Sequence, residues 1–219
     1  MRVNFTSFNY KPGADFNAEE RNYLGYHVQL AKALPGLRFY ATGVFRNARG
    51  VKPSHYRAAI LAFDSADAAS AAMRTETGRK VRQDGVDHLI DGRPLAFDAA
   101  EIVPFDSREV GRTYFMMAAE ADLKPAPGET QAAAEDRYLH YHTGVARKLP
   151  GLRAYTIGRL VETRGAIPDR FRMALLVFDS AEALRAAYRS PVGQELILDE
   201  ERSIAPNARV HRLDVTVQV

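Results

Sequence analysis

An internal repeat constrains the fold more than any other feature of this sequence. Positions 23 to 78 match positions 138 to 193 at a constant offset of 115 residues without a gap, and 27 of the 56 aligned positions are identical. The longest matches are YLGYH at 23–27 with YLHYH at 138–142, LPGLR at 34–38 with LPGLR at 149–153, and FDSA at 63–66 with FDSA at 178–181. The chain therefore holds two copies of one unit of ~105 residues.

The two copies meet at a short polar joint near Asp106, Ser107 and Arg108. We therefore predict one domain at 1–107, called the first half, and a second at 108–219, called the second half. A chain of this length can bury a sizeable core without disulfide or metal staples.

Each half follows the predicted order strand, helix, strand, strand, helix, strand. In the first half we expect strands at 3–8, 37–45, 56–63 and 100–105, helices at 17–34 and 66–74, and a polar loop at 46–54. Asn17 and Glu20 have the spacing of a capping box, and Pro35-Gly36 ends the first helix. The second half repeats the order, from a strand at 113–119 to a last strand at 210–219.

This βαββαβ order is that of a ferredoxin-like unit, an α+β fold with an antiparallel sheet and both helices on one face. The other face of each sheet needs a cover. We expect the two bare faces to pack together into a closed or nearly closed barrel with the helices outside.

The motifs Tyr-x-x-x-His, Leu-Pro-Gly-Leu-x-x-Tyr and an apolar strand ending in Phe-Asp-Ser-Ala-x-Ala, followed by a glycine, occur in this order in both halves. The set resembles the ethyl tert-butyl ether degradation (EthD) family of dimeric α/β-barrel proteins. This resemblance implies ferredoxin-like halves whose sheets pair into a barrel, normally between two chains and here as an intramolecular pseudo-dimer. A further homodimer stays open. Relatives in the superfamily include methylmuconolactone isomerases, cofactor-free quinone-forming monooxygenases and haem peroxidases, and many members have no assigned reaction.

A tyrosine and a histidine share one face of the first helix in each half. Tyr23 and His27 lie one helical turn apart on an apolar stripe, and Tyr138 and His142 repeat the pair. Histidine titrates near neutrality, so His27 and His142 are candidate catalytic acid–base residues, and a phenol can hydrogen-bond a substrate carbonyl. The alternative is that these are packed helix residues whose polar atoms bond to the backbone.

The resemblance to muconolactone-type isomerases implies that a further tyrosine, after the Pro-Gly turn, borders the pocket. That residue is Tyr40 in the first half and Tyr155 in the second. Strand alternation places Arg38 on the face of Tyr40, and Arg153 repeats it, so these arginines either pair with a substrate carboxylate or face solvent at the rim.

Two other pairs, Asp64-Ser65 and Asp179-Ser180, have the residue types of an acid and a nucleophile. They stand where a strand meets a helix, and helix capping explains both side chains.

Composition removes several functional classes. The absence of cysteine excludes disulfides, thiolate metal sites and a cysteine nucleophile. The net charge of +3 is spread along the chain, so we expect no nucleic-acid or membrane partner. The six histidines lack metal-ligand spacing, and we expect no metal and no cofactor. No segment is apolar and long enough to cross a membrane, and we expect a cytoplasmic protein.

The leading functional hypothesis is an EthD-like protein that binds a small apolar cyclic or aromatic carbonyl compound. As an enzyme it would be a cofactor-independent isomerase or monooxygenase of a catabolic reaction. The alternative is a non-catalytic accessory or assembly module whose barrel is filled by side chains. An open pocket beside the helix histidines would favour the first hypothesis.

Overall fold

The computed structural model describes residues 1–47, 52–163, 165 and 167–219. The elements of the first half are β1 (Arg2–Tyr10), α1 (Phe16–Asn22), η1 (Tyr23–His27), α2 (Val28–Lys32), β2 (Leu37–Phe45), β3 (Arg57–Phe63), α3 (Ala66–Arg74), α4 (Glu76–His88) and β4 (Leu89–Val103). Those of the second half are β5 (Thr113–Ala121), α5 (Gln131–Arg137), η2 (Tyr138–His142), α6 (Thr143–Ala146), β6 (Leu152–Val161), β7 (Arg172–Phe178), α7 (Ala181–Arg189), α8 (Pro191–Ser203) and β8 (Arg209–Val217).

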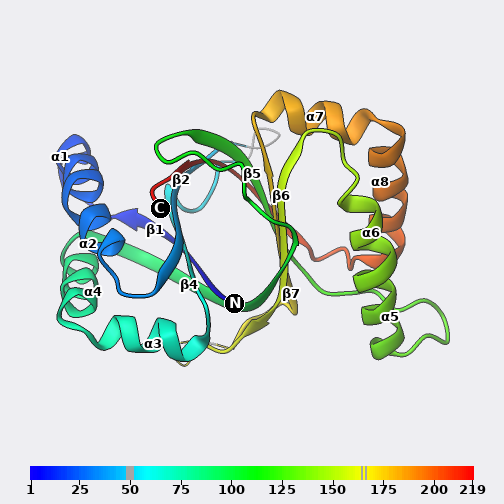
Figure 1. The fold of residues 1–219 in the computed structure, drawn as a ribbon, viewed down its shortest axis with the longest axis horizontal. Coiled ribbons are helices and arrows are strands. Elements are labelled where there is room, and N and C mark those ends of the chain that lie inside the picture. The colour runs from blue at the N-terminus through cyan, green and yellow to red at the C-terminus, as the bar shows by residue number, and fades with distance from the viewer. Residues whose placement is uncertain (48–51, 164, 166) are drawn as a thin grey trace.

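The strands form one closed barrel in the order β1-β3-β2-β8-β5-β7-β6-β4. The two halves join edge to edge, because β2 pairs with β8 and β4 pairs with β6, both antiparallel. The helices of the first half lie on one flank of the barrel and those of the second half on the opposite flank (Figure 1). The predicted ferredoxin-like units and their paired sheets are confirmed.

The barrel interior is one apolar core to which both halves contribute. Its buried side chains include Phe5, Ile60 and Phe97 from the first half and Met173 and Leu213 from the second. Alternation along each strand sends one set of side chains into this shared core and the other set outward, under the helices. Smaller apolar clusters lie between each sheet and its helices.

The first helix of each half contains a π-helical turn. In the first half the helix runs through α1, η1 and α2, and the backbone N–H of Val28 donates to the carbonyl of Tyr23 within the π turn. The prediction of Asn17 as its cap is wrong, because the Asp15 side chain accepts from the backbone N–H groups of Asn17 and Ala18. Gly36, with φ of 72°, ends the segment as predicted.

The second helical segment of each half is longer than predicted. After α3 the chain breaks at Thr75, whose side chain caps α4 by accepting from Gly78 N–H, and α4 then runs to His88. A Cβ at Gly78 would collide with the backbone of Ala72, which explains the glycine that the repeat retains. The last strand is longer as well, since β4 begins at Leu89 rather than at 100.

The polar loop and the domain boundary are the two remaining expectations from the sequence. Positions 48–51 of the expected polar loop lie outside the described residues. The domain boundary at 107/108 stays a prediction. In the described parts of the chain, no helix combines the length and the apolar character that a membrane crossing requires.

A buried ion network ties the two halves together inside the barrel. Glu120 of β5 is fully buried and accepts from two guanidinium nitrogens of Arg93 in β4, both at 2.6 Å, and from His211 Nε2 in β8 at 3.0 Å. Burial alone would raise the pKa of Glu120, but hydrogen bonds from His211 and Arg93 lower it to about 2.

We predict that Glu120→Gln destabilises the fold by on the order of 3 kcal/mol at pH 7. The Glu120 pKa is about 2 when folded against 4.5 when unfolded, so its stabilisation is complete above pH 4.5 and disappears as the pH falls toward 2. Urea unfolding of both proteins from pH 7 to pH 3 should show the difference shrinking toward low pH. A difference independent of pH would contradict this origin.

Candidate functional site

Each half holds a buried histidine–aspartate pair between its π turn and its last helix. His27 Nδ1 lies 2.7 Å from Asp84 Oδ2, and His142 Nδ1 lies 2.7 Å from Asp199 Oδ2. Burial would raise the pKa of both aspartates, but the hydrogen bond with histidine outweighs it and the pKa is lowered. An ionised carboxylate only accepts hydrogen bonds, so Nδ1 is the donor in each pair and Nε2 is the ring nitrogen not engaged by the aspartate.

A phenol ring stacks on each of these imidazoles. The Tyr23 and His27 centroids are 5.1 Å apart with 19° between ring planes, and those of Tyr138 and His142 are 4.7 Å apart with 15°. Burial raises the pKa of Tyr23 to about 12 and also raises the pKa of Tyr138, so both phenols keep their protons at neutral pH.

The predicted second tyrosine joins each pair. Tyr40 and Tyr155 are buried, and this burial raises the pKa of both phenols well above the ordinary value. In the first half, the Tyr23 and Tyr40 hydroxyls are buried without a hydrogen-bond partner among the described residues. In the second half, Tyr138 and Tyr155 line a cavity.

In each half, an arginine from the third strand packs over the ring of the stacked tyrosine. The Arg57 guanidinium lies 5.1 Å from the Tyr23 ring centroid and pairs with Glu20. Arg172 lies 4.9 Å from the Tyr138 centroid and pairs with Glu135. The two pairs differ in one contact: Arg57 Nε also donates to Glu20 at 3.0 Å, whereas Arg172 Nε is buried without a partner among the described residues.

The structure does not bring Arg38 and Arg153 to these sites. Arg38 Nε donates to Asp64 at 2.7 Å and Arg153 Nε donates to Asp179 at 2.9 Å, both at exposed positions. Arg38 instead borders a separate cavity of about 480 Å³ inside the barrel, together with Met1 and Met116.

The capping prediction for the two Asp-Ser pairs is half right. Ser65 and Ser180 cap α3 and α7 by accepting backbone N–H bonds. The predicted capping role of Asp64 and Asp179 is wrong, because both carboxylates bind arginine side chains.

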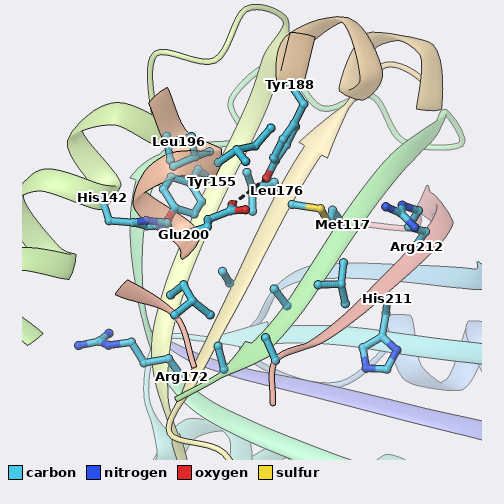
Figure 2. Close-up of a pocket in the computed structure, with 18 of the residues that line it drawn as sticks. Met117, His142, Tyr155, Arg172, Leu176, Tyr188, Leu196, Glu200, His211 and Arg212 are labelled. Atoms are coloured by element: carbon cyan, nitrogen blue, oxygen red, sulfur yellow. Dashed lines mark hydrogen bonds between the residues drawn. The ribbon is translucent and has the colours of Figure 1, made fainter. Parts of the chain in front are cut away.

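A cavity of about 890 Å³ opens beside His142, between the outer face of the second-half sheet and its helices. His142, Tyr155 and Glu200 come together at one end of it, and Met117 and Arg212 lie toward the other (Figure 2). The first half contributes to the wall as well, through residues 45–46 and 52–55. A volume in this range accommodates a ring compound of drug-like size.

Two substitutions between the halves account for the room beside Tyr138. The strand registers place Phe8 opposite Arg57 and Ala121 opposite Arg172, so Ala121 stands where the first half has Phe8, and Leu123 stands where it has Tyr10. In the first half the Phe8 and Tyr10 rings lie 5.2 and 6.4 Å from the Tyr23 ring. The second half lacks both rings and has a cavity in their place.

Glu200 is an ionisable group of the cavity that the sequence reasoning missed. It lies on α8 directly after Asp199, and the Tyr188 hydroxyl donates to its Oε1 at 3.2 Å. Burial is the main cause of a raised Glu200 pKa, and the neighbouring Asp199 charge raises it further. A carboxyl with a raised pKa beside a histidine base is a candidate acid partner. The corresponding position in the first half is Gly85.

The signal for the missed residues was present in the repeat. At the same offset of 115, Asp84 matches Asp199 and Gly85 matches Glu200, six and seven positions beyond the last matched glycine. The helix predicted from the sequence ends at 74, so that prediction leaves Asp84, Asp199, Gly85 and Glu200 outside any helix of the site. No three His, Asp or Glu side chains gather as a metal site in the part of the chain that the structure describes.

Comparison with known proteins supports the fold. No protein-family model matches the sequence, and no curated protein matches it. A solved structure from Fusobacterium nucleatum, named "putative monooxygenase", is 10% identical with a TM-score of 0.67, covering 100% of this chain and 92% of its own. An anthrone oxidase-like protein is 13% identical with a TM-score of 0.62, covering 99% and 92%. A third structure, from Lactobacillus acidophilus and named as the first, is 12% identical with a TM-score of 0.61, covering 99% and 96%.

The chain has the dimeric α/β-barrel fold. These solved structures match nearly the whole chain, so the paired arrangement of both halves is shared and not only the single ferredoxin-like unit. At identities of 10 to 13%, the likeness concerns the fold alone.

We predict unequal effects on stability for two substitutions at the matched sheet position. Phe8→Ala should destabilise the protein by about 3–5 kcal/mol, since it removes a buried ring from a filled site. Ala121→Phe should change stability by less than about 1 kcal/mol, because the added ring enters existing space rather than a packed core. Guanidinium unfolding measures both. An Ala121→Phe cost as large as that of Phe8→Ala would contradict an open cavity beside Tyr138.

Proposed function

We propose that the second half binds a small apolar, cyclic or aromatic carbonyl compound, and that the chain is an EthD-like barrel enzyme that moves a proton without a cofactor. The observation that carries this proposal is the cavity bordered by His142, a histidine whose Nδ1 is held by the Asp199 carboxylate. The motifs shared by both halves support the EthD resemblance.

The side chains of the cavity suggest how a proton would move. His142 Nε2 takes a proton from the carbon next to a ligand carbonyl, and the electron pair of that C–H bond moves onto the carbonyl oxygen. A phenol of Tyr138 or Tyr155 donates a hydrogen bond to this oxygen. Return of the proton to another carbon, from the imidazolium or from protonated Glu200, gives isomerisation. Reaction of the same carbanion with dioxygen forms a C–O bond and, after protonation, a hydroperoxide. Loss of the second hydrogen from that carbon then breaks the O–O bond, releases water and leaves a new carbonyl, which is oxygenation with dioxygen as the oxidant.

The fold neighbours bear on the second of these outcomes. Two of them have names that include monooxygenase and a third is anthrone oxidase-like, which is in keeping with oxygenation. Since their identities to this chain are below 25%, the site residues and not the neighbours carry the proposal. Arg38 and Arg153 lie outside the His142 cavity and have no part in it.

A non-catalytic role is the second candidate, and the first half is where an observation favours it. There the Tyr23 ring is surrounded by Phe8, Tyr10 and the Arg57–Glu20 pair, and Tyr10 donates to Glu20 at 2.5 Å. We propose that His27, Tyr23 and Tyr40 keep the first half folded and that turnover belongs to the second half.

The two histidines provide a matched test within one chain. In D₂O, ¹H NMR follows exchange of the acidic C–H of ring ketones such as anthrone and 2-tetralone. We expect the wild-type protein to accelerate this exchange. We expect His142→Gln to lower the rate by about 10²–10⁴-fold, the usual contribution of a general base, and His27→Gln to leave it within about twofold.

Melting temperatures of both variants serve as the control, since each loses the same Asp-bound imidazole. Equal losses of exchange in the two variants would contradict the assignment to the second half. No acceleration by the wild-type protein would contradict proton transfer and favour the non-catalytic role.

Glu200→Gln should stabilise the protein while impairing exchange. The raised pKa means that the folded state disfavours the Glu200 charge, so ionisation above about pH 4.5 destabilises the fold and a neutral amide removes this cost. We expect a higher melting temperature than wild type at pH 7 and no difference below about pH 4. A lower melting temperature at pH 7 would show that the ionised Glu200 carboxylate stabilises the fold.

A further inference from the structure

The wall of the His142 cavity is unevenly charged. Its described lining residues include four permanently basic side chains, Arg46, Lys52, Arg172 and Arg212, and one acidic side chain, Glu200. A positive excess in a cavity with apolar walls favours an anionic ligand, because charge interactions strengthen where water is excluded.

Two of the three arginines are already paired, and Arg212 is the exception. Arg46 Nε donates to Asp214 at 2.5 Å, and Arg172 pairs with Glu135. Among the residues that the structure describes, no carboxylate pairs with the Arg212 guanidinium, although its backbone carbonyl accepts from Arg46 N–H at 2.8 Å. Within the described part of the chain, the Arg212 side chain therefore has no carboxylate partner that would compete with a ligand.

The place of Arg212 in the sheet makes it part of the cavity. It pairs with Met117 in the register of β5 and β8, and both side chains line the cavity. Figure 2 shows the two side by side, across the cavity from His142, with the Tyr188–Glu200 hydrogen bond between the two ends. The corresponding register pair of the first half is Asn4 with Ala96, so the first half has no cation here.

We infer that the ligand of the second half is an apolar ring compound that carries a carboxylate, bound by the Arg212 guanidinium, with its reactive carbonyl toward His142. This inference rests on the proposed function, because it adds a carboxylate to the carbonyl compound that we propose for the His142 cavity. A planar guanidinium binds a carboxylate through two parallel hydrogen bonds, which fixes orientation as well as charge. The ring spans the apolar wall formed by residues such as Met117 and Leu176.

A pair of probes that differ only in charge tests the inference, 2-naphthoate and its neutral analogue 2-naphthamide. Methyl-labelled methionine NMR reports where each binds: Met117 lines the His142 cavity, whereas Met1 and Met116 line the separate cavity inside the barrel. We expect both probes to shift the Met117 signal, with a Kd for naphthoate about tenfold or more below that of naphthamide.

Arg212→Gln should raise the naphthoate Kd by about ten- to a hundredfold and leave the naphthamide Kd within about twofold. Arg46→Gln is the matched control, because it removes a neighbouring cation that Asp214 already holds. We expect this variant to keep the preference for naphthoate.

Three outcomes would overturn the inference. Equal affinities for the two probes at Met117 would exclude anion recognition and leave the proposed function standing. A preference for naphthoate that survives Arg212→Gln would place the anion on another group. Binding of neither probe at Met117 would contradict the proposed function together with this inference.

Discussion

The edge-to-edge pairing of the two halves is the constraint on which the rest of the structure depends. A ferredoxin-like unit alone leaves two strand edges and one apolar sheet face exposed, which are a liability for a soluble chain. Here β2 pairs with β8 and β4 pairs with β6, so the described strands close into a barrel and the inner faces form a single core. With the inner face occupied by this core, the large cavity opens on the outer face, between sheet and helices.

The histidine–aspartate pair alone does not distinguish the two halves. Both pairs join a π turn to the helix that packs on it, with the same 2.7 Å contact and the same sequence separation of 57 residues. What differs is the surroundings. Phe8 and Tyr10 fill the first site, and Ala121 and Leu123 leave space in the second, where Glu200 replaces Gly85.

The repeat was sufficient to predict the fold, because two copies of a βαββαβ unit have few ways to bury both sheet faces. Helical spacing was also sufficient to place Tyr23 and His27 on one face, whereas Tyr40 was expected beside them only from the family resemblance. The repeat did not reveal the carboxylates, because Asp84 and Asp199 lie 57 residues from their histidines and on a helix that was predicted to end early. The repeat did not predict the asymmetry between the halves either. A repeat draws attention to identities, whereas the cavity arises at positions where the copies differ.

Two differences between the halves, at the third-strand arginine and on the last helix, leave the second site less well satisfied than the first, whereas the phenol hydroxyls that lack a partner in the described part of the chain lie in the first site. Arg172 Nε has no partner among the described residues where Arg57 Nε has Glu20, and the phenol that supports Glu20 has no counterpart because Leu123 stands in its place. Glu200 adds a carboxyl whose charge is disfavoured by burial. Such groups lower stability unless something else compensates, and active sites are where proteins tolerate them. Because both halves share one core, the well-packed first half and the Glu120 network can supply that compensation. A homodimer of one copy, with two identical open sites, would lack it.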